Sequence, residues 1–364
     1  MGGRVGRVTP AGVIDETSGL SADSAPWGIA TRPGGAMWFT ERAANRIGRI
    51  TSAGTISEFS AGLPADSQPE GIAEGPDGNM WFTEPGANQI GRITSAGTIT
   101  QYRFSSGLSE HRGLVAIAAG RDGNLWFTEA AGQIGRITPA GTITEFSAGL
   151  PVASRPDGIA AGPDGNMWFT EPGANQIGRI TPSGTITEFS AGLSAGSQPD
   201  GIAAGPDGNV WFTEPGTGQI GRITPTGTVT EFSLGATADG FPEGITAGPG
   251  ATMWFTESLG NRIGRVSFNA VVATGDPTSI TSTTATVTGA VNPIGLANQY
   301  HFEYGTTGYG KSTASGTVAA TDTVSPVTTS LTGLLPDTVY HYRLVATTAA
   351  GTVKGADHKL RTLG

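Results

Sequence analysis

The stretch Gly158-Ile-Ala-Ala-Gly-Pro-Asp-Gly-Asn-Met-Trp-Phe-Thr-Glu171 decides the fold, because its last four residues recur along the chain. Trp-Phe-Thr-Glu occurs six times, and successive copies lie 43, 45, 42, 43 and 43 residues apart. One aromatic motif in every ~40–45 residues is typical of the blades of a β-propeller. The six copies begin at Trp38, Trp81, Trp126, Trp168, Trp211 and Trp254.

One repeat, residues 156–189, predicts four short antiparallel strands, so we expect an all-β protein. Turn residues such as Gly162-Pro-Asp-Gly-Asn166 separate the apolar and β-branched stretches, because Pro fixes φ and Gly accepts positive φ. Four strands per repeat make one blade, and each blade buries its faces only against its neighbours. The predicted strands cover residues 156–161, 167–171, 176–181 and 185–189.

The number of blades follows from the incomplete repeats at the two ends of this region. Five repeats have all four strands, and residues 243–268 supply three more. Residues 4–9 and 12–17 resemble the third and fourth strands of a repeat. Pairing 12–17 with the last three strands would close the ring without an open edge, which predicts six blades and leaves 4–9 surplus. Seven blades is the alternative.

Residues 269–364 break the pattern and predict a second domain, a β-sandwich. They are rich in Thr, Ser and Val and contain no Trp. Leu334, Leu335, Pro336, Tyr340 and Tyr342 resemble the corner of a fibronectin type III domain, where a Tyr hydroxyl locks the turn. We therefore expect a propeller over 1–268 and a fibronectin type III-like domain over 269–364. Its predicted strands are 284–291, 299–304, 327–331, 339–347 and 352–360.

Charge and composition exclude several classes of function. The net charge is −9, and residues 269–364 have five acids and five bases, so the whole excess lies in 1–268. An acidic surface argues against nucleic acid as a partner, and no run is long enough for membrane insertion. There is no Cys, and no Lys in 1–268, which excludes thiolate and Lys chemistry there. The opening residues, Met1 to Arg4, carry no apolar signal segment.

The Glu that ends each copy of the motif has two interpretations. A ring of carboxylates on one face would be functional. A residue present in every blade more often serves the blade itself, so we expect each Glu to pair with the equally periodic Arg of the third strand. The Glu residues are Glu41, Glu84, Glu129, Glu171, Glu214 and Glu257, and the Arg residues are Arg49, Arg92, Arg136, Arg179, Arg222 and Arg265.

A second periodic position, directly before the Gly-Ile of each first strand, predicts a cation site. If the first strand is innermost, its side chains converge at the mouth of the central channel. Carboxylate oxygens are the ligands that Ca²⁺ and Mg²⁺ prefer, and like charges that close need a cation or raised pKa values. A solvated acidic rim without an ion is the alternative. The candidate metal ligands are Glu70, Asp157, Asp200 and Glu243, and Trp27 and Val115 interrupt the series.

The repeat departs from symmetry after its second blade, where a non-structural role would be visible. The usual Glu-Phe-Ser becomes Gln101-Tyr102-Arg103, and the following loop contains His111 and Arg112. His111 is the only histidine before residue 269, although a lone loop histidine is usually a surface residue. We expect Trp27, Tyr102, Arg103 and Arg112 to contact a ligand.

The repeat is similar to that of the virginiamycin B lyase family, over residues 1–268. The shared elements are Gly-Pro-Asp-Gly-Asn-x-Trp-Phe-Thr-Glu, Ile-Gly-Arg-Ile-Thr and Gly-Thr-Ile-Thr-Glu-Phe. The resemblance implies an enzyme that opens a cyclic depsipeptide at its ester by elimination, with Mg²⁺, a Glu and several histidines on one face. Only His111 could be the catalytic histidine here, and no repeat has a histidine after its Trp-Phe-Thr-Glu.

We therefore expect a binding or scaffold module, with a glycan, a peptide or a small molecule as the ligand. Near-identical blades present the same side chains at successive rotations, which suits a repeated ligand better than one reaction centre. The appended domain favours an extracellular or cell-surface location. The alternative is a Mg²⁺-dependent lyase of the streptogramin B type that eliminates across a C–O bond.

Overall fold

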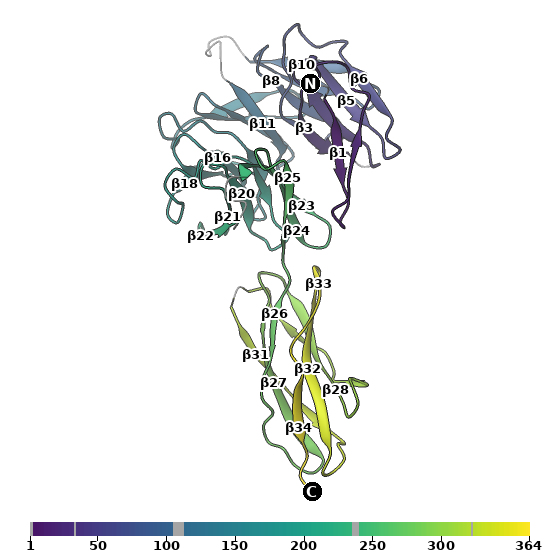
Figure 1. Ribbon diagram of the computed structural model, residues 1–364. Helices are drawn as coiled ribbons and strands as arrows, with labels where there is room; N and C mark the ends of the chain where they lie inside the picture. The colour runs from purple at the N-terminus through teal and green to yellow at the C-terminus, as the bar shows by residue number, and fades with distance from the viewer. Residues whose placement is uncertain (1–2, 33, 105–112, 235–239, 322) are drawn as a thin grey trace. The chain divides into compact units, whose positions relative to one another are not determined.

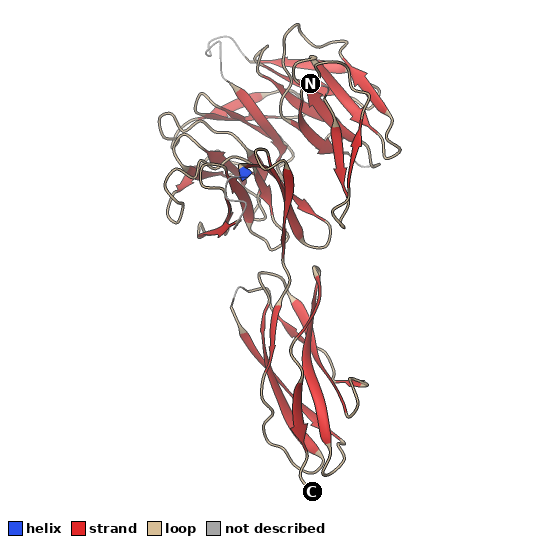
Figure 2. Ribbon diagram, in the orientation of Figure 1, coloured by secondary structure: helices blue, strands red, loops and turns tan. Residues whose placement is uncertain are grey.

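The computed structural model describes residues 3–32, 34–104, 113–234, 240–321 and 323–364. Nearly all of their regular secondary structure is β-strand (Figure 2), so the expected all-β class is confirmed. In this described part, no helix has the length and apolarity needed to cross a membrane. The chain forms two compact units. The first comprises residues 1–204, 209–246 and 255–264, and the second comprises 205–208, 247–254 and 265–364.

Five four-stranded antiparallel sheets, the complete blades, follow one another along the chain (Figure 1). In each sheet the strands lie in sequence order, so every connection within a blade is a hairpin. The strands are β3 Pro26–Thr31, β4 Met37–Glu41, β5 Arg46–Ile50 and β6 Ile56–Phe59; β7 Ile72–Glu74, β8 Met80–Glu84, β9 Gln89–Ile93 and β10 Ile99–Arg103; β11 Leu114–Ala119, β12 Leu125–Glu129, β13 Gln133–Ile137 and β14 Ile143–Phe146; β15 Ile159–Ala161, β16 Met167–Glu171, β17 Gln176–Ile180 and β18 Ile186–Phe189; and β19 Ile202–Ala204, β20 Val210–Glu214, β21 Gln219–Ile223 and β22 Val229–Ser233.

Two incomplete sheets flank these blades. Strands β1 (Val5–Val8) and β2 (Ile14–Thr17) form a two-stranded sheet. Strands β23 (Pro242–Gly248), β24 (Thr252–Glu257) and β25 (Arg262–Ser267) form a three-stranded sheet. Among the described strands β2 pairs only with β1, so the expected pairing of 12–17 with the last three strands is not made. The repeat count predicts which strands exist but not which edges meet, and six blades stays a prediction.

Successive blades are held together by apolar clusters that span each pair of neighbours. One cluster joins the Trp of one blade, such as Trp168, to the first strand and the Phe of the next, such as Ile202 and Phe212. Trp168 and Phe212 are completely buried. The same arrangement recurs between the first and second, second and third, and third and fourth blades.

The glycine in the middle of each third strand makes room for the Phe of the motif. In the fourth blade Phe169 lies opposite Gly178 in the register, and a Cβ added at Gly178 would lie 2.0 Å from the Phe169 ring. Real Cβ atoms do not approach that closely, so the ring occupies the place of the missing side chain. The glycine of the Ile-Gly-Arg-Ile motif is therefore explained by packing, because a larger residue there would displace the Phe ring.

The Arg of the third strand packs on aromatic rings, and the expected Arg–Glu pairs are not formed. Arg179 lies 5.5 Å from the Trp168 ring and 5.4 Å from the Phe189 ring, and its Nη1 donates to the Pro225 carbonyl at 2.9 Å. Arg179 is directly opposite Trp168 in the register, whereas Glu171 lies three residues further along β16. Side chains alternate between faces along a strand, so Arg179 and Glu171 lie on opposite faces of the sheet.

The second unit contains two antiparallel sheets around one core. Strands β26, β27 and β31 form one sheet, and β28 pairs with β29, β30 and β32 in the other, where β32 also pairs with β33 and β34. Both sheets contribute to one buried cluster that includes Val287, Phe302 and Leu344. The strands are β26 Val271–Thr274, β27 Thr284–Asn292, β28 Asn298–Gly305, β29 Lys311–Ser312, β30 Gly316–Val318, β31 Ser325–Thr332, β32 Val339–Thr348, β33 Gly351–Lys354 and β34 His358–Arg361.

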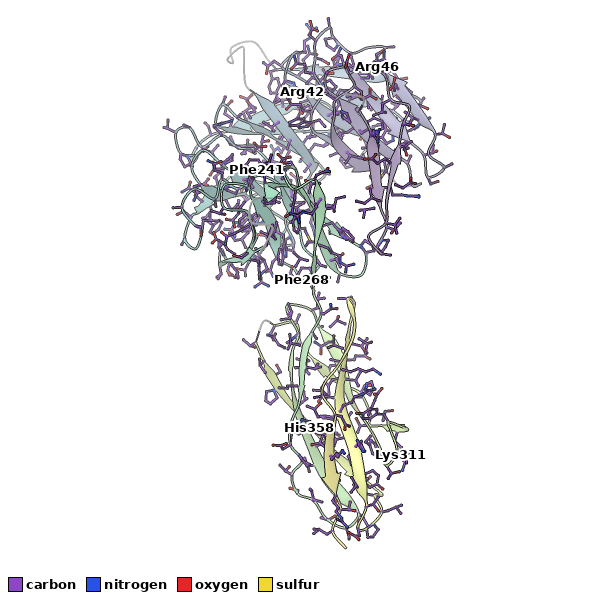
Figure 3. The ribbon with its side chains drawn as sticks, viewed as in Figure 1. Arg42, Arg46, Phe241, Phe268, Lys311 and His358 are labelled. Carbon is purple, nitrogen blue, oxygen red and sulfur yellow. The ribbon has the colours of Figure 1, made fainter. Side chains whose placement is uncertain are left out.

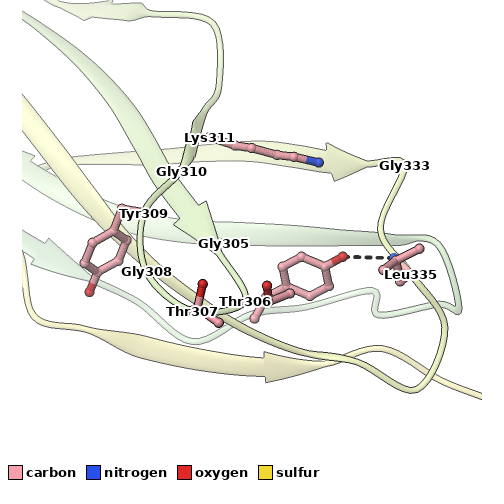
Figure 4. Close-up of a pocket in the computed structure, with 10 residues that line it drawn as sticks. Gly305, Thr306, Thr307, Gly308, Tyr309, Gly310, Lys311, Gly333 and Leu335 are labelled. Carbon is pink, nitrogen blue, oxygen red and sulfur yellow. Dashed lines mark hydrogen bonds between the residues drawn. The ribbon is translucent and has the colours of Figure 1, made fainter.

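One predicted strand of this unit, residues 352–360, is wrong as a single element. The chain forms β33 and β34, which pair with different halves of β32. Between them the Gly355 N–H donates to the Leu344 carbonyl at 2.8 Å, and the backbone leaves the strand path. The hydrogen bond expected at the corner around Tyr340 is present, because the Tyr340 hydroxyl accepts from the Leu335 N–H at 3.0 Å (Figure 4).

Candidate functional site

The first strands of the complete blades are the innermost strands. β3 lies beside β7, β7 beside β11, β11 beside β15 and β15 beside β19, although none of these neighbours is paired in a sheet. Strand spacing is tight at this point, since a Cβ at Gly158 would lie 2.5 Å from the Asp200 carbonyl oxygen. The residue before each Gly-Ile therefore lies at the inner edge of its blade, as the sequence predicts.

The Thr of the Trp-Phe-Thr-Glu motif fixes this inner edge. Thr170 Oγ1 accepts from the Gly158 N–H of its own blade at 2.9 Å and donates to the Asp200 carbonyl of the next blade at 2.6 Å. We call this pattern the threonine relay. It repeats in the other complete blades, where the hydroxyls of Thr40, Thr83, Thr128 and Thr213 donate to the carbonyls of Glu70, Val115, Asp157 and Glu243.

Four carboxylates lie at this inner edge, and we call Glu70, Asp157, Asp200 and Glu243 the acidic ring. Their charges act on one another. Burial, together with the charges of Asp157 and Glu243, raises the pKa of Asp200 to about 7. Burial also raises the pKa of Asp157, against the opposing effect of Arg155. The structure therefore brings the predicted carboxylates into one electrostatic group, in which a charge on one disfavours a charge on the next.

At Glu70 a cation compensates part of this negative charge. Arg42 Nε lies 3.0 Å from Glu70 Oε1, and the guanidinium also lies 5.3 Å from the centre of the Trp27 ring. Burial raises the pKa of Glu70, Arg42 opposes that rise, and Asp157 adds to it. Trp27 remains 62% exposed, so most of the indole can meet a ligand. Figure 3 labels Arg42 on this part of the chain.

Arg42 and Ser258 also belong to the site, although the pattern of the first strands did not predict them. Ser258 Oγ donates to Glu243 Oε1 at 3.0 Å. Both residues directly follow a Trp-Phe-Thr-Glu motif, where Pro85, Pro172 and Pro215 stand in other blades. A polar residue in place of Pro at this position was the available signal.

The asymmetric segment after the second blade is described only in part. The Tyr102 ring stacks on Trp81 with centroids 4.9 Å apart, and Arg92 lies 5.6 Å from its centre. Tyr102 thus takes the position that Phe189 has beside Trp168. Arg103 is exposed at the end of β10. His111 and Arg112 lie outside the described residues, so their predicted roles stay predictions.

The acidic ring does not form a ready metal cage. Within the described ranges, no three His, Cys, Asp or Glu side chains are close enough together to hold one ion. The oxygen donors suit Mg²⁺ or Ca²⁺ by their chemistry, but a bound ion would meet at most two of these carboxylates and would keep much of its water. The predicted cation site therefore stays a prediction.

The second unit has its own groove, of about 470 Å³ (Figure 4). The loop from Gly305 to Gly310 forms one wall, with Lys311 beside it, and Leu335 and Tyr340 form the other. None of the residues predicted for ligand or metal binding lies there. Tyr309 is engaged, since its hydroxyl donates to Asp357 at 2.6 Å and Arg343 lies 3.9 Å from its ring centre.

Comparison with known proteins gives a consistent assignment. The family model described as virginiamycin B lyase family matches residues 1–192 and 150–320. The solved virginiamycin B lyase of Staphylococcus aureus is 40% identical, with a TM-score of 0.66 over 72% of this chain and 87% of that one. A streptogramin B lyase structure is 37% identical, with a TM-score of 0.67 over 72% and 85%. No curated protein matches the chain.

A third similar structure concerns catalysis. It is a catalytically inactive histidine-to-alanine variant of the Staphylococcus aureus enzyme with quinupristin, 40% identical, with a TM-score of 0.67 over 72% of this chain and 87% of that one. The repeat, the packing of Trp, Arg and Phe, and these matches all agree. This chain belongs to the virginiamycin B lyase family.

Proposed function

We propose that this protein is a binding module whose ligand contacts the acidic ring and Trp27. The observation that carries the proposal is the gathering of four carboxylates at the inner edge, where burial and then the charges of Asp157 and Glu243 raise the pKa of Asp200 to about 7. Partly buried carboxylates that repel one another are stabilised by any group that supplies positive charge or hydrogen-bond donors. A ligand with such groups would therefore bind where the inner edges of the blades meet.

The chemistry of the ligand follows from these side chains. Carboxylates accept hydrogen bonds from sugar hydroxyls and from the ammonium or guanidinium groups of a peptide. The exposed Trp27 indole offers an aromatic face for a sugar ring or an apolar side chain, and Arg42 holds it in place from 5.3 Å. We therefore propose a glycan or a basic peptide as the ligand class, ahead of other small molecules.

A divalent cation is part of this proposal in a limited form. We propose that Mg²⁺ or Ca²⁺, if it binds, is held by Asp200 with one neighbouring carboxylate and by water. Because the pKa of Asp200 is raised to about 7, that side chain is fully charged only above neutral pH. Cation binding should accordingly strengthen as the pH rises through about 7.

The experiment compares the full chain with the Asp157→Asn/Asp200→Asn variant on glycan and basic-peptide arrays. Binding by the wild type that the variant loses is the expected result, and binding that the variant keeps would contradict the proposal. Melting temperatures with and without millimolar Mg²⁺ or Ca²⁺ should show an increase in the wild type alone. The Asp15→Asn/Glu16→Gln variant, at two exposed positions of β2 whose partners are the exposed Arg7 and Arg4, is the matched control for loss of two negative charges.

A second candidate function is favoured by family membership: a lyase that opens a streptogramin B antibiotic. The small number of histidines argues against this function, since residues 1–268 contain only His111. In the Staphylococcus aureus enzyme, one histidine-to-alanine change accompanies the loss of catalysis. A general base must be present and in reach before it can act.

Incubation with quinupristin and Mg²⁺ tests this second function. We expect the ester to remain intact by mass spectrometry, because the chain lacks the histidines of the reaction. A linear product that forms with the wild type and disappears with His111→Ala would establish the lyase function instead. The Staphylococcus aureus enzyme is the positive control.

We further propose that residues 269–364 are a fibronectin type III-like module and that the protein works outside the cell. The support for the module is its two-sheet core and the hydrogen bond from the Leu335 N–H to the Tyr340 hydroxyl. Such modules commonly act as spacers, which suits a surface-displayed binding protein. Proteolysis of intact cells of the source would test the location, because an exposed protein would be cleaved.

A further inference from the structure

The Glu of each Trp-Phe-Thr-Glu motif places a carboxyl group inside its blade, where it needs a hydrogen-bond donor or a compensating charge. It lies on the same face of its strand as the motif's Phe, and the fourth strand places a polar residue beside it. Glu41, Glu84, Glu171 and Glu214 are all 0% exposed. The polar partners come from one position of the fourth strand, two residues after its start, and are Glu58, Gln101, Glu145, Glu188 and Glu231.

In the second blade the partner is an amide. Gln101 Nε2 donates to Glu84 Oε1 at 3.2 Å, so one neutral donor faces the buried carboxyl group. Gln has the shape of a protonated Glu, with an N–H₂ group in place of the O–H. This blade thus carries a permanent hydrogen-bond donor where the other complete blades carry a second acid.

In the first blade a cation accompanies the acid pair. Arg46 Nη1 lies 2.5 Å from Glu58 Oε2, and the Ser21 N–H donates to Glu58 Oε1 at 2.8 Å. Figure 3 labels Arg46. The corresponding residues of the fourth and fifth blades are Gln176 and Gln219, which carry no charge. The first blade therefore has one positive charge for its two carboxyl groups.

The fourth blade has neither the amide nor the cation. Glu171 and Glu188 occupy the positions that Glu84 and Gln101 have in the second blade, where the two side chains are hydrogen-bonded, so two carboxyl groups meet here. All four of their carboxyl oxygens are buried, and no donor from the described residues reaches any of them. In the fifth blade Glu214 and Glu231 face each other in the same way. There the Ser194 N–H and hydroxyl donate to Glu231. The Ser197 hydroxyl near Glu214 donates to Asn175 instead, so both oxygens of Glu214 are buried without a hydrogen bond from the described residues.

We propose that the Glu171–Glu188 pair and the Glu214–Glu231 pair each hold one shared proton in the folded protein at neutral pH. The proton supplies the donor that Gln101 supplies in the second blade, and it removes negative charge that Arg46 offsets at Glu58 in the first. Two full negative charges in contact inside a protein are strongly unfavourable, and a shared proton removes one charge and supplies the missing donor.

The electrostatics of the surroundings agree with this assignment. Burial and then Glu171 raise the pKa of Glu188 to about 10. Burial and then Glu231 raise the pKa of Glu214 to about 8, against a smaller lowering by Ser197. Among the described groups that act on these two carboxyls there is no Arg, Lys or His, so no cation competes with the proton.

The shared protons link folding to pH with a definite sign. The folded pKa values lie above the ordinary value of 4.5, so the folded state binds protons that the unfolded state releases. Stability from these pairs is therefore complete below about pH 4.5 and is lost progressively as the pH rises through about 8 and about 10.

The test compares the full-length wild type with Glu188→Gln/Glu231→Gln, which gives both blades the amide that the second blade already has. The wild-type melting temperature should fall between about pH 5 and about pH 9, and the double variant should fall less steeply. The reverse change, Gln101→Glu, should steepen the fall because it creates an acid pair in the one complete blade that has an amide at this position. Glu16→Gln, at an exposed position, should leave the slope unchanged.

Infrared spectroscopy gives a readout that does not depend on a variant that folds. At about pH 9, above the raised pKa values of Glu41, Glu84, Asp200 and Glu214, the wild type should keep a protonated-carboxyl C=O band from the Glu171–Glu188 pair, because the pKa of Glu188 is raised to about 10. Absence of that band, or a double variant with the wild-type slope, would overturn the proposal. A divalent cation that stabilises the wild type but not the double variant would also overturn it, because the pairs would then hold a metal ion.

Discussion

A single hydroxyl, that of Thr170, connects two blades and satisfies two backbone groups. It accepts from the Gly158 N–H and donates to the Asp200 carbonyl, and Thr170 is 0% exposed. A buried backbone group left without a partner costs about 1–3 kcal/mol. The recurrence of Thr in every Trp-Phe-Thr-Glu motif thus has a physical reason: its hydroxyl is both the donor and the acceptor that links the inner strands.

Replacement of Thr170 by Val tests this role. Val keeps the shape but leaves the Gly158 N–H and the Asp200 carbonyl unpaired, so we expect a loss of about 1–3 kcal/mol in the free energy of unfolding. Urea denaturation of the full chain measures it. Thr185→Val is the control, because Thr185 is exposed and bonds to Thr181 through its backbone N–H and carbonyl, which the substitution keeps. Equal losses in the two variants would contradict the relay.

At the scale of the element, the sequence predicts the strands well and the contacts between their side chains less well. The turn residues and the period of ~43 residues predict β15 to β18, since turns that contain Gly, Pro or Asn separate these strands, although β15 begins at Ile159 and not at residue 156. The Arg–Glu pairs were wrong, because Arg179 lies on the face of Trp168 and Glu171 on the other. Alternation along the strand contained that information, but the choice of partner across a blade depends on the register.

For the acidic ring too, the sequence predicts the position of the residues but not the contacts of their side chains. Its position follows from the repeat, because every first strand enters at the same place. The raised pKa of Asp200 depends on its burial and on how near Asp157 and Glu243 come, and the packing of neighbouring blades sets both. Arg42 was missed as a partner of Glu70 because the two residues lie 28 positions apart, in different blades.

At the scale of the whole molecule, each unit has its own core. The second unit buries a cluster that runs from Ala270 to Leu360 and includes residues of both its sheets. A domain with a contiguous core can fold alone. The pairing of the ring's ends could not be predicted, because β1 and β25 both resemble third strands and the sequence does not distinguish which of them a neighbouring edge accepts.

The segment 265–364 should therefore fold when expressed alone. We expect cooperative urea unfolding and a dispersed amide NMR spectrum. Leu344→Ala should lower the free energy of unfolding by about 2–5 kcal/mol, because Leu344 is 0% exposed in the shared core. A Leu335→Ala variant, at a residue that is 63% exposed, should have a much smaller effect. A fragment without a cooperative transition would show that this core is not sufficient.

The threonine relay has a consequence for the history of the chain. From the second to the fifth complete blade, each has a Thr hydroxyl that donates to the next blade and a carbonyl that accepts from the previous one. In the fourth blade these groups are the Thr170 hydroxyl and the Asp157 carbonyl. A gene segment of one period, duplicated or deleted by unequal recombination, would therefore leave every remaining junction chemically intact. The near-identity of residues 156–190 and 199–233 is what a recent duplication of this kind would leave behind.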